Sequence, residues 1–204
     1  TFALVFGSTM YGQSIKLPVN ENKERGKTVL QALADRKSTG EFSDRELSLE
    51  DLSDLLWAAN GINRPEIGKK TAPSAQNAQE IDIYVCLKNG AYIYDAKEHA
   101  LNFVSKGDFR MMGERKAGAV AAPCLLVLVA ETSRYNAERN TKEHINNMSY
   151  VDGGIVSQNI SVFCAGADIG TKPRAQMDRN GLKEALKLSD SQVLILNHPV
   201  GYFK

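Results

Sequence analysis

The sequence predicts an α+β protein with a central, mostly antiparallel sheet flanked by helices. The dipeptide Asn89-Gly90 separates two alternating apolar segments, 81–87 and 92–95, as in a two-residue β-hairpin. Residues 124–130, CLLVLVA, are apolar throughout, which is typical of a strand buried on both faces. Residues 142–169 place apolar side chains at helical spacing, so we expect one long helix there.

Shorter elements precede and follow these three. Residues 28–34 predict an amphipathic helix with Val29, Leu30 and Leu33 on its apolar face. Residues 48–60 predict a second helix, because a serine followed three residues later by an acid is typical of a capped helix start. The remaining expected elements are, in chain order, a strand at 100–104, a helix at 106–116, a helix at 182–188 and a strand at 192–196.

Composition describes an ordinary globular chain and excludes several classes of function. The 25 Lys and Arg residues nearly balance 24 Asp and Glu residues, and the net charge of +1 argues against nucleic-acid binding. No apolar run reaches the ~18 residues that a membrane span needs. The three cysteines lie in apolar segments without metal-ligand spacing, so we expect buried structural thiols and no metal site; they are Cys86, Cys124 and Cys164.

Common catalytic motifs are missing from the sequence. It contains no G-x-G-x-x-G fingerprint and no phosphate-binding G-x-x-x-x-G-K loop, which argues against Rossmann and P-loop nucleotide sites. His99, His144 and His198 are scattered, and none accompanies a nucleophile-elbow pattern. We therefore expect surface or turn histidines rather than a Ser/His/Asp triad.

The first twelve residues, TFALVFGSTMYG, differ from the rest of the chain. An apolar run followed by small and polar residues is typical of the end of a secretory signal peptide, with cleavage before Gln13. The alternative is an apolar N-terminal arm that packs on a partner subunit. Residues 13–204 then form a single domain, which is either exported to the periplasm or cell envelope or, in the alternative, cytoplasmic.

A polar turn at residues 73–79 leads into the strand at 81–87. It is rich in amides and hydroxyls, which both donate and accept hydrogen bonds. A flat heteroaromatic ring with alternating donors and acceptors needs such a rim. The simpler interpretation is an ordinary turn before a strand.

Three motifs in this order resemble the nitroreductase family of flavin enzymes. They are R-K-S-x-x-x-F at 36–42, P-S-A-x-N-x-Q at 73–79 and the closing N-H-P-V-G-Y-F-K at 197–204. The segments T-A-P-S, G-I-V-S-Q-N-I and P-V-G-Y look closest to the branch that includes thiazole/oxazole-forming oxidases. The resemblance implies a nitroreductase-like fold in which the long helix is the spine of an intertwined homodimer. Gly153, Gly154 and Gly166 fit this role, because small residues let another helix approach closely.

The resemblance implies that a flavin mononucleotide phosphate binds the basic segment and the C-terminus. Arg36 and Ser38 would contact the phosphate, ribityl chain and ring edge, Lys37 would assist, and Lys204 would close on the phosphate. The family often has a second arginine two positions after the serine, where this chain has Gly40. The alternatives are helix C-terminal charges for the basic pair and a solvated tail for the last lysine.

The resemblance also assigns residues to the flavin ring. The ring-binding residues that it implies are Pro73, Ser74, Asn77, Arg174, Ala175 and Gln176. The Asn77 amide would match the carbonyl and imide edge of the ring, and Arg174 would add charge near its pyrimidine end. The backbone N–H of Gln176 would face the reactive ring nitrogen N5, and no catalytic side chain is implied.

The activity that follows from the resemblance is ping-pong electron transfer. NADH or NADPH would reduce FMN and leave, and an electron-poor organic acceptor of the nitro-aromatic or quinone type would then take the electrons. The alternative is an exported flavin- or small-ligand-binding protein without nicotinamide-driven turnover. The expected partners are a second copy of the chain and small molecules.

Overall fold

The structure is a computed structural model that describes residues 14–21, 24–113 and 121–204. Its main feature is a seven-stranded sheet in the order β1-β6-β5-β4-β7-β9-β8, and every pairing within it is antiparallel. The strands of this sheet are β1 Ile15–Lys16, β4 Ile81–Leu87, β5 Gly90–Asp95, β6 Ala100–Lys106, β7 Cys124–Glu131, β8 Ile169–Thr171 and β9 Gln192–Tyr202. The predicted α+β class with a mostly antiparallel sheet is confirmed.

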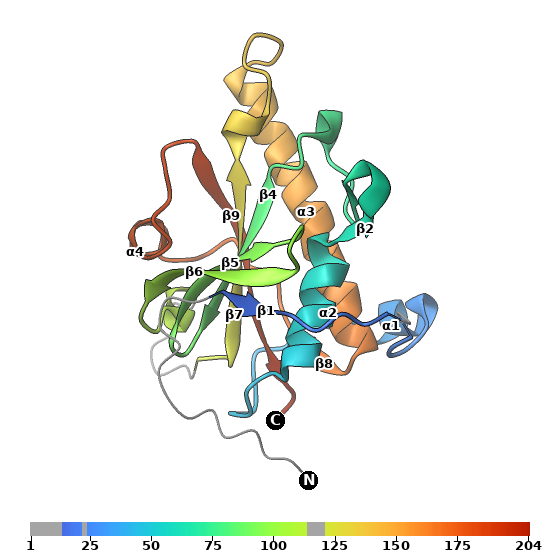
Figure 1. Cartoon of the computed structure of the whole chain (residues 1–204). Coiled ribbons are helices and arrows are strands. Elements are labelled where there is room, and N and C mark those ends of the chain that lie inside the picture. The colour runs from blue at the N-terminus through green and yellow to red at the C-terminus, as the bar shows by residue number, and fades with distance from the viewer. Residues whose placement is uncertain (1–13, 22–23, 114–120) are drawn as a thin grey trace.

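Helices cover both faces of this sheet, as Figure 1 shows. The helices are α1 Val29–Asp35, α2 Leu49–Asn60, α3 Lys142–Gly166 and α4 Arg179–Ala185. Helices α2 and α3 lie against one face and α4 against the other. A small two-stranded sheet, β2 Ile62–Arg64 and β3 Lys69–Lys70, follows α2 and leads to the amide-rich turn.

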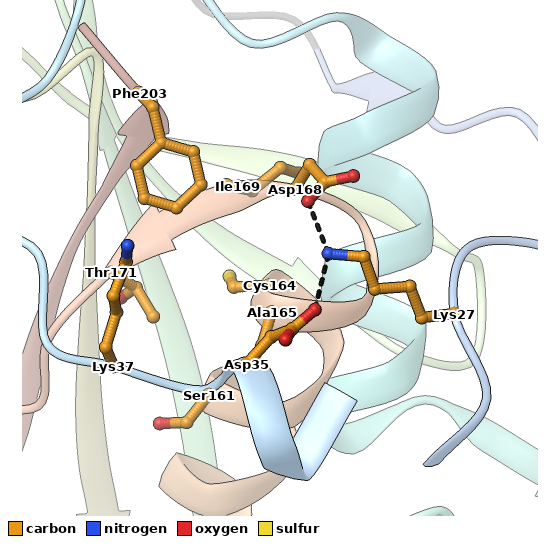
Figure 2. Close-up of a pocket in the computed structure, with 10 residues that line it drawn as sticks. All are labelled: Lys27, Asp35, Lys37, Ser161, Cys164, Ala165, Asp168, Ile169, Thr171 and Phe203. Atoms are coloured by element: carbon orange, nitrogen blue, oxygen red, sulfur yellow. Dashed lines mark hydrogen bonds and ion pairs between the residues drawn. The ribbon is translucent and has the colours of Figure 1, made fainter. Parts of the chain in front are cut away.

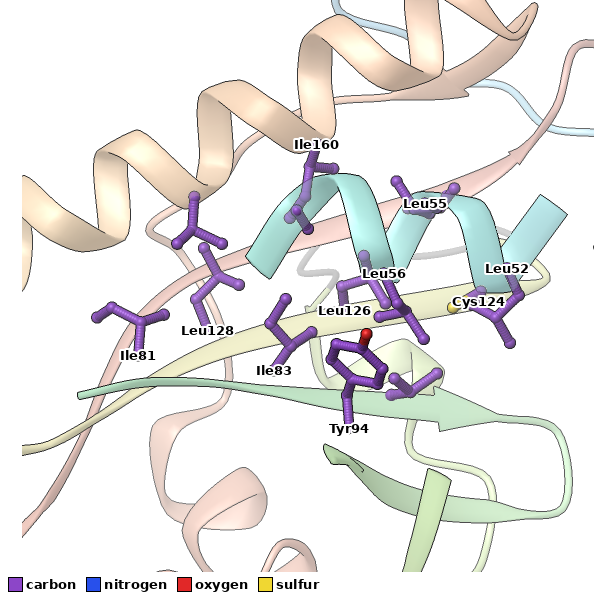
Figure 3. Packing of buried hydrophobic residues seen from close by; sticks show 14 of the residues in the cluster. Leu52, Leu55, Leu56, Ile81, Ile83, Tyr94, Cys124, Leu126, Leu128 and Ile160 are labelled. Carbon is purple, nitrogen blue, oxygen red and sulfur yellow. The ribbon is translucent and has the colours of Figure 1, made fainter. Parts of the chain in front are cut away.

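The hydrophobic core lies mainly between the sheet and the α2–α3 layer. Leu56 of α2 and Ile160 of α3 pack over Ile83 of β4 and Leu128 of β7 (Figure 3). Every residue of β7 except Glu131 is buried, because α2 and α3 cover one side and α4 covers the other. This confirms the prediction of a central strand buried on both faces.

Several element boundaries differ from the predictions. The expected helix at 106–116 is wrong in its described part: β6 continues to Lys106 and only a single 3-10 turn, η3 Arg110–Gly113, follows. The long helix ends at Gly166 instead of residue 169. The chain turns at Asp168, whose φ of 55° is left-handed, and then enters β8, a strand that we did not predict.

Helix α1 has the predicted position, but its larger apolar side chains point away from the core of the protomer. Val29, Leu30 and Leu33 are 67%, 79% and 47% exposed, whereas the small Ala32 is buried. Ala32 packs against the last turn of α3, where a Cβ built at Gly166 would lie 3.5 Å from the Ala32 Cβ, an ordinary contact distance. The three larger side chains therefore form an apolar surface on one protomer.

The signal-like segment 1–12 lies outside the described residues, so cleavage before Gln13 and export stay predictions. Within the part of the chain that the structure describes, no helix is both long enough and apolar enough to cross a membrane.

Candidate functional site

The amide-rich turn has a strained backbone that its own side chains support. Gln76, Asn77 and Gln79 have φ values of 54°, 56° and 50°, in the left-handed region that residues other than glycine seldom occupy. The Ser74 Oγ accepts a hydrogen bond from the backbone N–H of Gln79 at 2.9 Å. The Gln79 side-chain amide donates to Asn77 Oδ1 at 3.3 Å, which orients the Asn77 amide. Asn77 and Pro73 are exposed, and Ser74 is half-buried.

Two contacts attach this turn to the rest of the molecule. The backbone N–H of Ala75 donates to the Asp152 carboxylate of α3 at 2.8 Å. The side-chain amides of Gln76 and Asn140 exchange hydrogen bonds of 2.7 and 3.2 Å. Because left-handed residues persist only where surrounding contacts hold them, these anchors fix the direction in which the turn presents its amides.

The basic segment after α1 runs beside β8 and the end of β9. The backbone N–H of Thr39 donates to the carbonyl of Thr171 at 2.9 Å, and that of Ser43 donates to the carbonyl of Tyr202 at 3.0 Å. Two strand ends far apart in sequence therefore meet the segment that carries the predicted phosphate-binding residues. These residues, Arg36, Lys37 and Ser38, are all exposed.

A lysine that the sequence did not single out lies opposite Gly40. A Cβ built on Gly40 would be 3.3 Å from the Lys172 Nζ, so this ammonium group fills the space beside the missing side chain. The Lys37 Nζ lies 5.7 Å from the centre of the Phe203 ring, one residue before Lys204. Residues 37, 172 and 204 thus bring positive charge to one end of the molecule.

A pocket of about 190 Å³ lies at this end, against the last turns of α3 (Figure 2). In the figure Lys27 lies between two acids, and its Nζ is 2.6 Å from Asp168 and 2.8 Å from Asp35. The hydrogen bond to Asp168, with that to Asp35, raises the pKa of Lys27. The pocket is lined by Lys27, Asp35, Lys37, Ser161, Cys164, Ala165, Asp168, Ile169, Thr171 and Phe203.

A buried asparagine of β9 holds the loop at 174–176, which was predicted to face the flavin nitrogen N5. The backbones of Arg174 and Asn197 exchange hydrogen bonds of 2.9 and 2.8 Å. The Asn197 side-chain amide also donates to the carbonyls of Arg174 and Gln176, at 3.1 and 2.9 Å. Asn197 is completely buried, while Ala175 and Gln176 are exposed. The sequence prediction missed the role of Asn197, which follows the apolar run of the last strand.

One protomer does not bring all the predicted residues together. The amide-rich turn contacts α3 at Asp152, whereas the pocket beside Lys37 contacts α3 at Ser161 and Cys164. Twelve helical residues separate Asp152 from Cys164, a distance of about 18 Å along the helix. The basic segment and the C-terminus therefore share one end of α3, and the turn with Asn77 lies far from them.

Two buried acids and a tyrosine lie behind the turn. Glu80 and Asp152 are 0% and 3% exposed. The Tyr135 hydroxyl lies 3.1 Å from Glu80 Oε1 and 3.4 Å from Asp152 Oδ2. Burial, with the nearby charge of Asp152, raises the pKa of Glu80 to about 7. No local pattern predicted this cluster, because its members are far apart in the chain.

The expectation of surface or turn histidines is wrong for His198, which lies within β9 and is completely buried. Its Nε2 lies 2.8 Å from the Ser157 hydroxyl and its Nδ1 lies 3.2 Å from the Thr171 hydroxyl. The Thr171 hydroxyl donates to the carbonyl of Pro199, so Nδ1–H donates to Thr171 and Nε2 accepts from Ser157. Burial, with the Arg174 charge, lowers the pKa of His198 to about 3, which keeps the ring neutral.

The thiols agree with the predictions. The three cysteines are free and buried, as expected of structural thiols. Among the described residues, no cluster of histidine, cysteine, aspartate or glutamate side chains has the arrangement that a metal ion needs.

Comparison with known proteins gives the family. The model of the nitroreductase family matches residues 33–202. The chain belongs to the nitroreductase family. This confirms the family predicted from the three motifs, and the match includes the first two of them completely.

Individual relatives agree with this family and with the fold. A crystal structure described as a nitroreductase from Ralstonia eutropha JMP134 is 34% identical, covers 94% of this chain and 90% of its own, and superposes with a TM-score of 0.87. A protein of Methanocaldococcus jannaschii named for nitroreductase activity is 28% identical over 182 residues, 83% of this chain and 88% of the relative. A Parabacteroides distasonis structure, named as an NADH dehydrogenase or NAD(P)H nitroreductase, is 19% identical with a TM-score of 0.58, covers 86% of both chains and supports the fold alone.

Proposed function

We propose that this protein is a homodimeric, FMN-dependent oxidoreductase. It transfers electrons from NADH or NADPH to an electron-poor organic acceptor of the nitro-aromatic or quinone type, in a ping-pong sequence. The observation that carries the proposal is the meeting of the basic segment 36–43 with β8 and the C-terminus, in a chain of the nitroreductase family. Which acceptor the protein uses in the cell would then depend on the space that the fold leaves above the flavin ring.

The charges at this meeting point fit a phosphate group. A phosphate monoester carries nearly two negative charges at neutral pH, and lysine or arginine side chains and hydroxyls are its usual partners. Lys37 lies beside Phe203 and Lys172 lies beside Gly40, so two segments bring ammonium groups to this end of the molecule. Lys172 supplies the positive charge that would be lost with glycine at position 40.

The other predicted residues fit a flavin ring. The Asn77 amide is held by Gln79 and can pair with the alternating donors and acceptors of the pyrimidine edge. The loop at 174–176 is fixed by Asn197, so its exposed backbone can offer an N–H to the ring. When bound, the flavin supplies the hydride and electron chemistry, and these residues orient it and balance its charge.

A second copy of the chain completes the site in this proposal. The pocket of about 190 Å³ is smaller than the roughly 300–1,000 Å³ of usual ligand sites. Only another protomer brings an Asn77 turn to the basic end of α3, because the two are about 18 Å apart along one helix. Two antiparallel α3 helices that cross near their middle would place each turn beside the partner's basic segment.

Exposed apolar side chains supply a surface for this dimer. Val29 and Leu30 of α1 are 67% and 79% exposed, and Tyr150 and Val151 of α3 are 52% and 54% exposed. Gly154 lies one turn after Tyr150, and a Cβ built on it meets nothing within 4 Å. Burial of these side chains against a second copy would contribute about 1.5–3 kcal/mol for each large residue.

An absorbance spectrum of the pure protein tests the proposal. We expect bound flavin absorption that bleaches when NADH or NADPH is added without oxygen and returns with an electron-poor acceptor. Arg36→Ala and Lys204→Ala would each weaken FMN binding by about tenfold or more, since each removes a charge-assisted contact. Lys88→Ala is the matched control, because Lys88 lies in the β4–β5 turn.

Each outcome of this test has a distinct meaning. Flavin that stays oxidised with both nicotinamides would support a flavin-binding protein without nicotinamide-driven turnover and would overturn the oxidoreductase proposal. Protein that takes up no FMN would overturn both functions. Equal FMN affinity for Lys88→Ala, Arg36→Ala and Lys204→Ala would show that the phosphate binds elsewhere.

A further inference from the structure

We propose that Glu80 and Asp152 are positioning residues that share one proton and fix the amide-rich turn to α3. The inference deepens the proposed function and rests on it, because this turn would line the flavin ring. Neither acid touches the proposed cofactor site directly. They act through the backbone of Ala75, whose N–H donates to Asp152 Oδ2 at 2.8 Å.

The turn needs such an anchor because of its backbone. Three of its residues, Gln76, Asn77 and Gln79, have positive φ, and each such residue costs on the order of 1 kcal/mol or more. The conformation therefore persists only while contacts outside the turn hold it. Asp152 is a buried anchor at its start, and Asn140 is a half-buried one at its tip.

The number of protons in the cluster is limited. Tyr135 has one hydroxyl proton, which can go to Glu80 or to Asp152 but not to both. Glu80 Oε2 is buried and has no hydrogen-bond partner among the described residues. Two carboxylates here would place two negative charges behind a single hydroxyl, which burial strongly disfavours. One added proton leaves one negative charge, and this charge accepts the Ala75 N–H.

The charged side chains near the cluster interact mainly with other groups, so they do not neutralise the second carboxylate in place of this proton. Arg134, at the end of the 3-10 turn η4 Thr132–Arg134, forms its ion pair with Asp82 at 2.7 Å. Burial lowers the pKa of Lys70 on β3, and Asp82 offsets this more strongly than Glu80 does. The Glu131 carboxylate at the end of β7 accepts hydrogen bonds from the backbone N–H and the hydroxyl of Ser133, at 3.2 and 2.6 Å.

The consequence is a turn whose order depends on pH. Burial and Asp152 raise the pKa of Glu80 to about 7, so the shared proton is present in mildly acidic solution and is lost above neutrality. Loss of the proton leaves Glu80 and Asp152 both negative, and their repulsion separates β4 from α3 at the point where Ala75 is held. The turn then presents Asn77 less rigidly.

Two measurements on the full-length protein test this inference. The first is the amide-exchange protection factor of Ala75 without added flavin, and the second is the FMN dissociation constant, both from about pH 5.5 to about pH 8.5. We expect protection to fall and the dissociation constant to rise by about tenfold across this range in the wild type. Glu80→Gln, which is neutral at every pH, should keep the acid-side values throughout. Glu131→Gln is the matched control and should follow the wild type.

Two further variants keep the test decisive if Glu80→Gln does not fold. Asp152→Asn retains an acceptor for the Ala75 N–H and should give a flat profile, whereas Asp152→Ala should lose Ala75 protection at every pH. A Glu80→Gln or Asp152→Asn profile that follows the wild type would overturn the inference, as would normal protection in Asp152→Ala. If the wild type binds no FMN, the proposed function fails, and the exchange profile alone still decides whether the pair holds the turn through a shared proton.

Discussion

The adjacent glycines of α3 allow a direct test of the proposed dimer. Gly153 and Gly154 differ in what an added methyl group would meet. A Cβ built on Gly153 lies 2.6 Å from the Ile195 Cγ2 of β9, while one built on Gly154 meets nothing within 4 Å in the protomer. Gly153→Ala thus creates a clash inside the chain, and Gly154→Ala creates one only if a second copy packs on this face.

The two possibilities for Gly154→Ala have opposite signs. In a lone protomer the change should raise the free energy of unfolding by about 1 kcal/mol, because alanine is favoured over glycine inside a helix. In a dimer with close α3 contacts, the added methyl overpacks the interface at a cost of about 1–3 kcal/mol. The dimer dissociation constant should then rise by about 5- to 150-fold.

Sedimentation and urea unfolding at two protein concentrations distinguish these cases. We expect Gly154→Ala to dissociate at higher concentration than the wild type and to unfold with a stronger dependence on concentration. Gly153→Ala, the matched control, should lower the stability of each protomer and leave the dissociation constant nearly unchanged. A Gly154→Ala protein that is more stable and keeps the wild-type oligomeric state would refute the proposed interface.

Three further predictions concern single side chains. Lys172→Ala should weaken FMN binding by about tenfold and reduce the salt dependence of binding. Adding Gly40→Arg to this variant should restore both quantities in fluorescence titrations. If it does not, Lys172 is not part of the phosphate site. His198→Gln should reduce the loss of stability in acid, by up to about 1.4 kcal/mol per pH unit. The folded-state pKa of about 3 lies below the ordinary value of 6.5, so only the unfolded chain binds the proton as the pH falls between these values. Urea unfolding at about pH 4 to 7 measures this effect. The control His144→Gln, at an exposed position, should behave as the wild type does. Tyr202→Phe removes the hydroxyl that donates to Asp51 and accepts the Ser48 N–H at 3.1 Å, and should lower the free energy of unfolding by about 1–2 kcal/mol; an unchanged urea midpoint would show that this anchor is dispensable.

Local sequence patterns predicted the elements whose neighbours in the chain decide their structure. The turn at Asn89 lies between two segments that pair with each other, so β4 and β5 follow from a short stretch. Strand β7 is apolar along its whole length, and α3 has helical periodicity. In these cases the pattern and the fold agree.

Other features depend on contacts that no local pattern contains. The apolar residues of α1 fit a helix buried against its own sheet, but the side that packs carries Ala32, which faces Gly166 far along the chain. His198 is buried because β9 continues past the apolar segment 192–196 and passes under α3. The expected helix at 106–116 had helical composition, but its first residue extends a strand that pairs with Gly90.

The candidate site was predictable only where a motif named its residues. Arg36, Asn77 and Lys204 were found through resemblance to the family, since charge or turn composition alone did not distinguish them. Lys172 lies beside Gly40 and Asn197 pairs with Arg174, and both proximities follow from the fold and not from a local pattern. The acids behind the turn required the fold itself, because 72 residues separate Glu80 from Asp152.

Strand β9 joins two attachment points through a fixed number of residues, which limits the insertions and deletions that it can accept. The same eleven residues hold the loop at 174–176 through Asn197 and end at Tyr202, which is attached to α2. About 17 Å of extended chain separates these two positions. Removal of a single residue between them would turn one of the two side chains to the opposite face of the sheet, so the loop at 174–176 and the attachment to α2 can be held together only at this strand length.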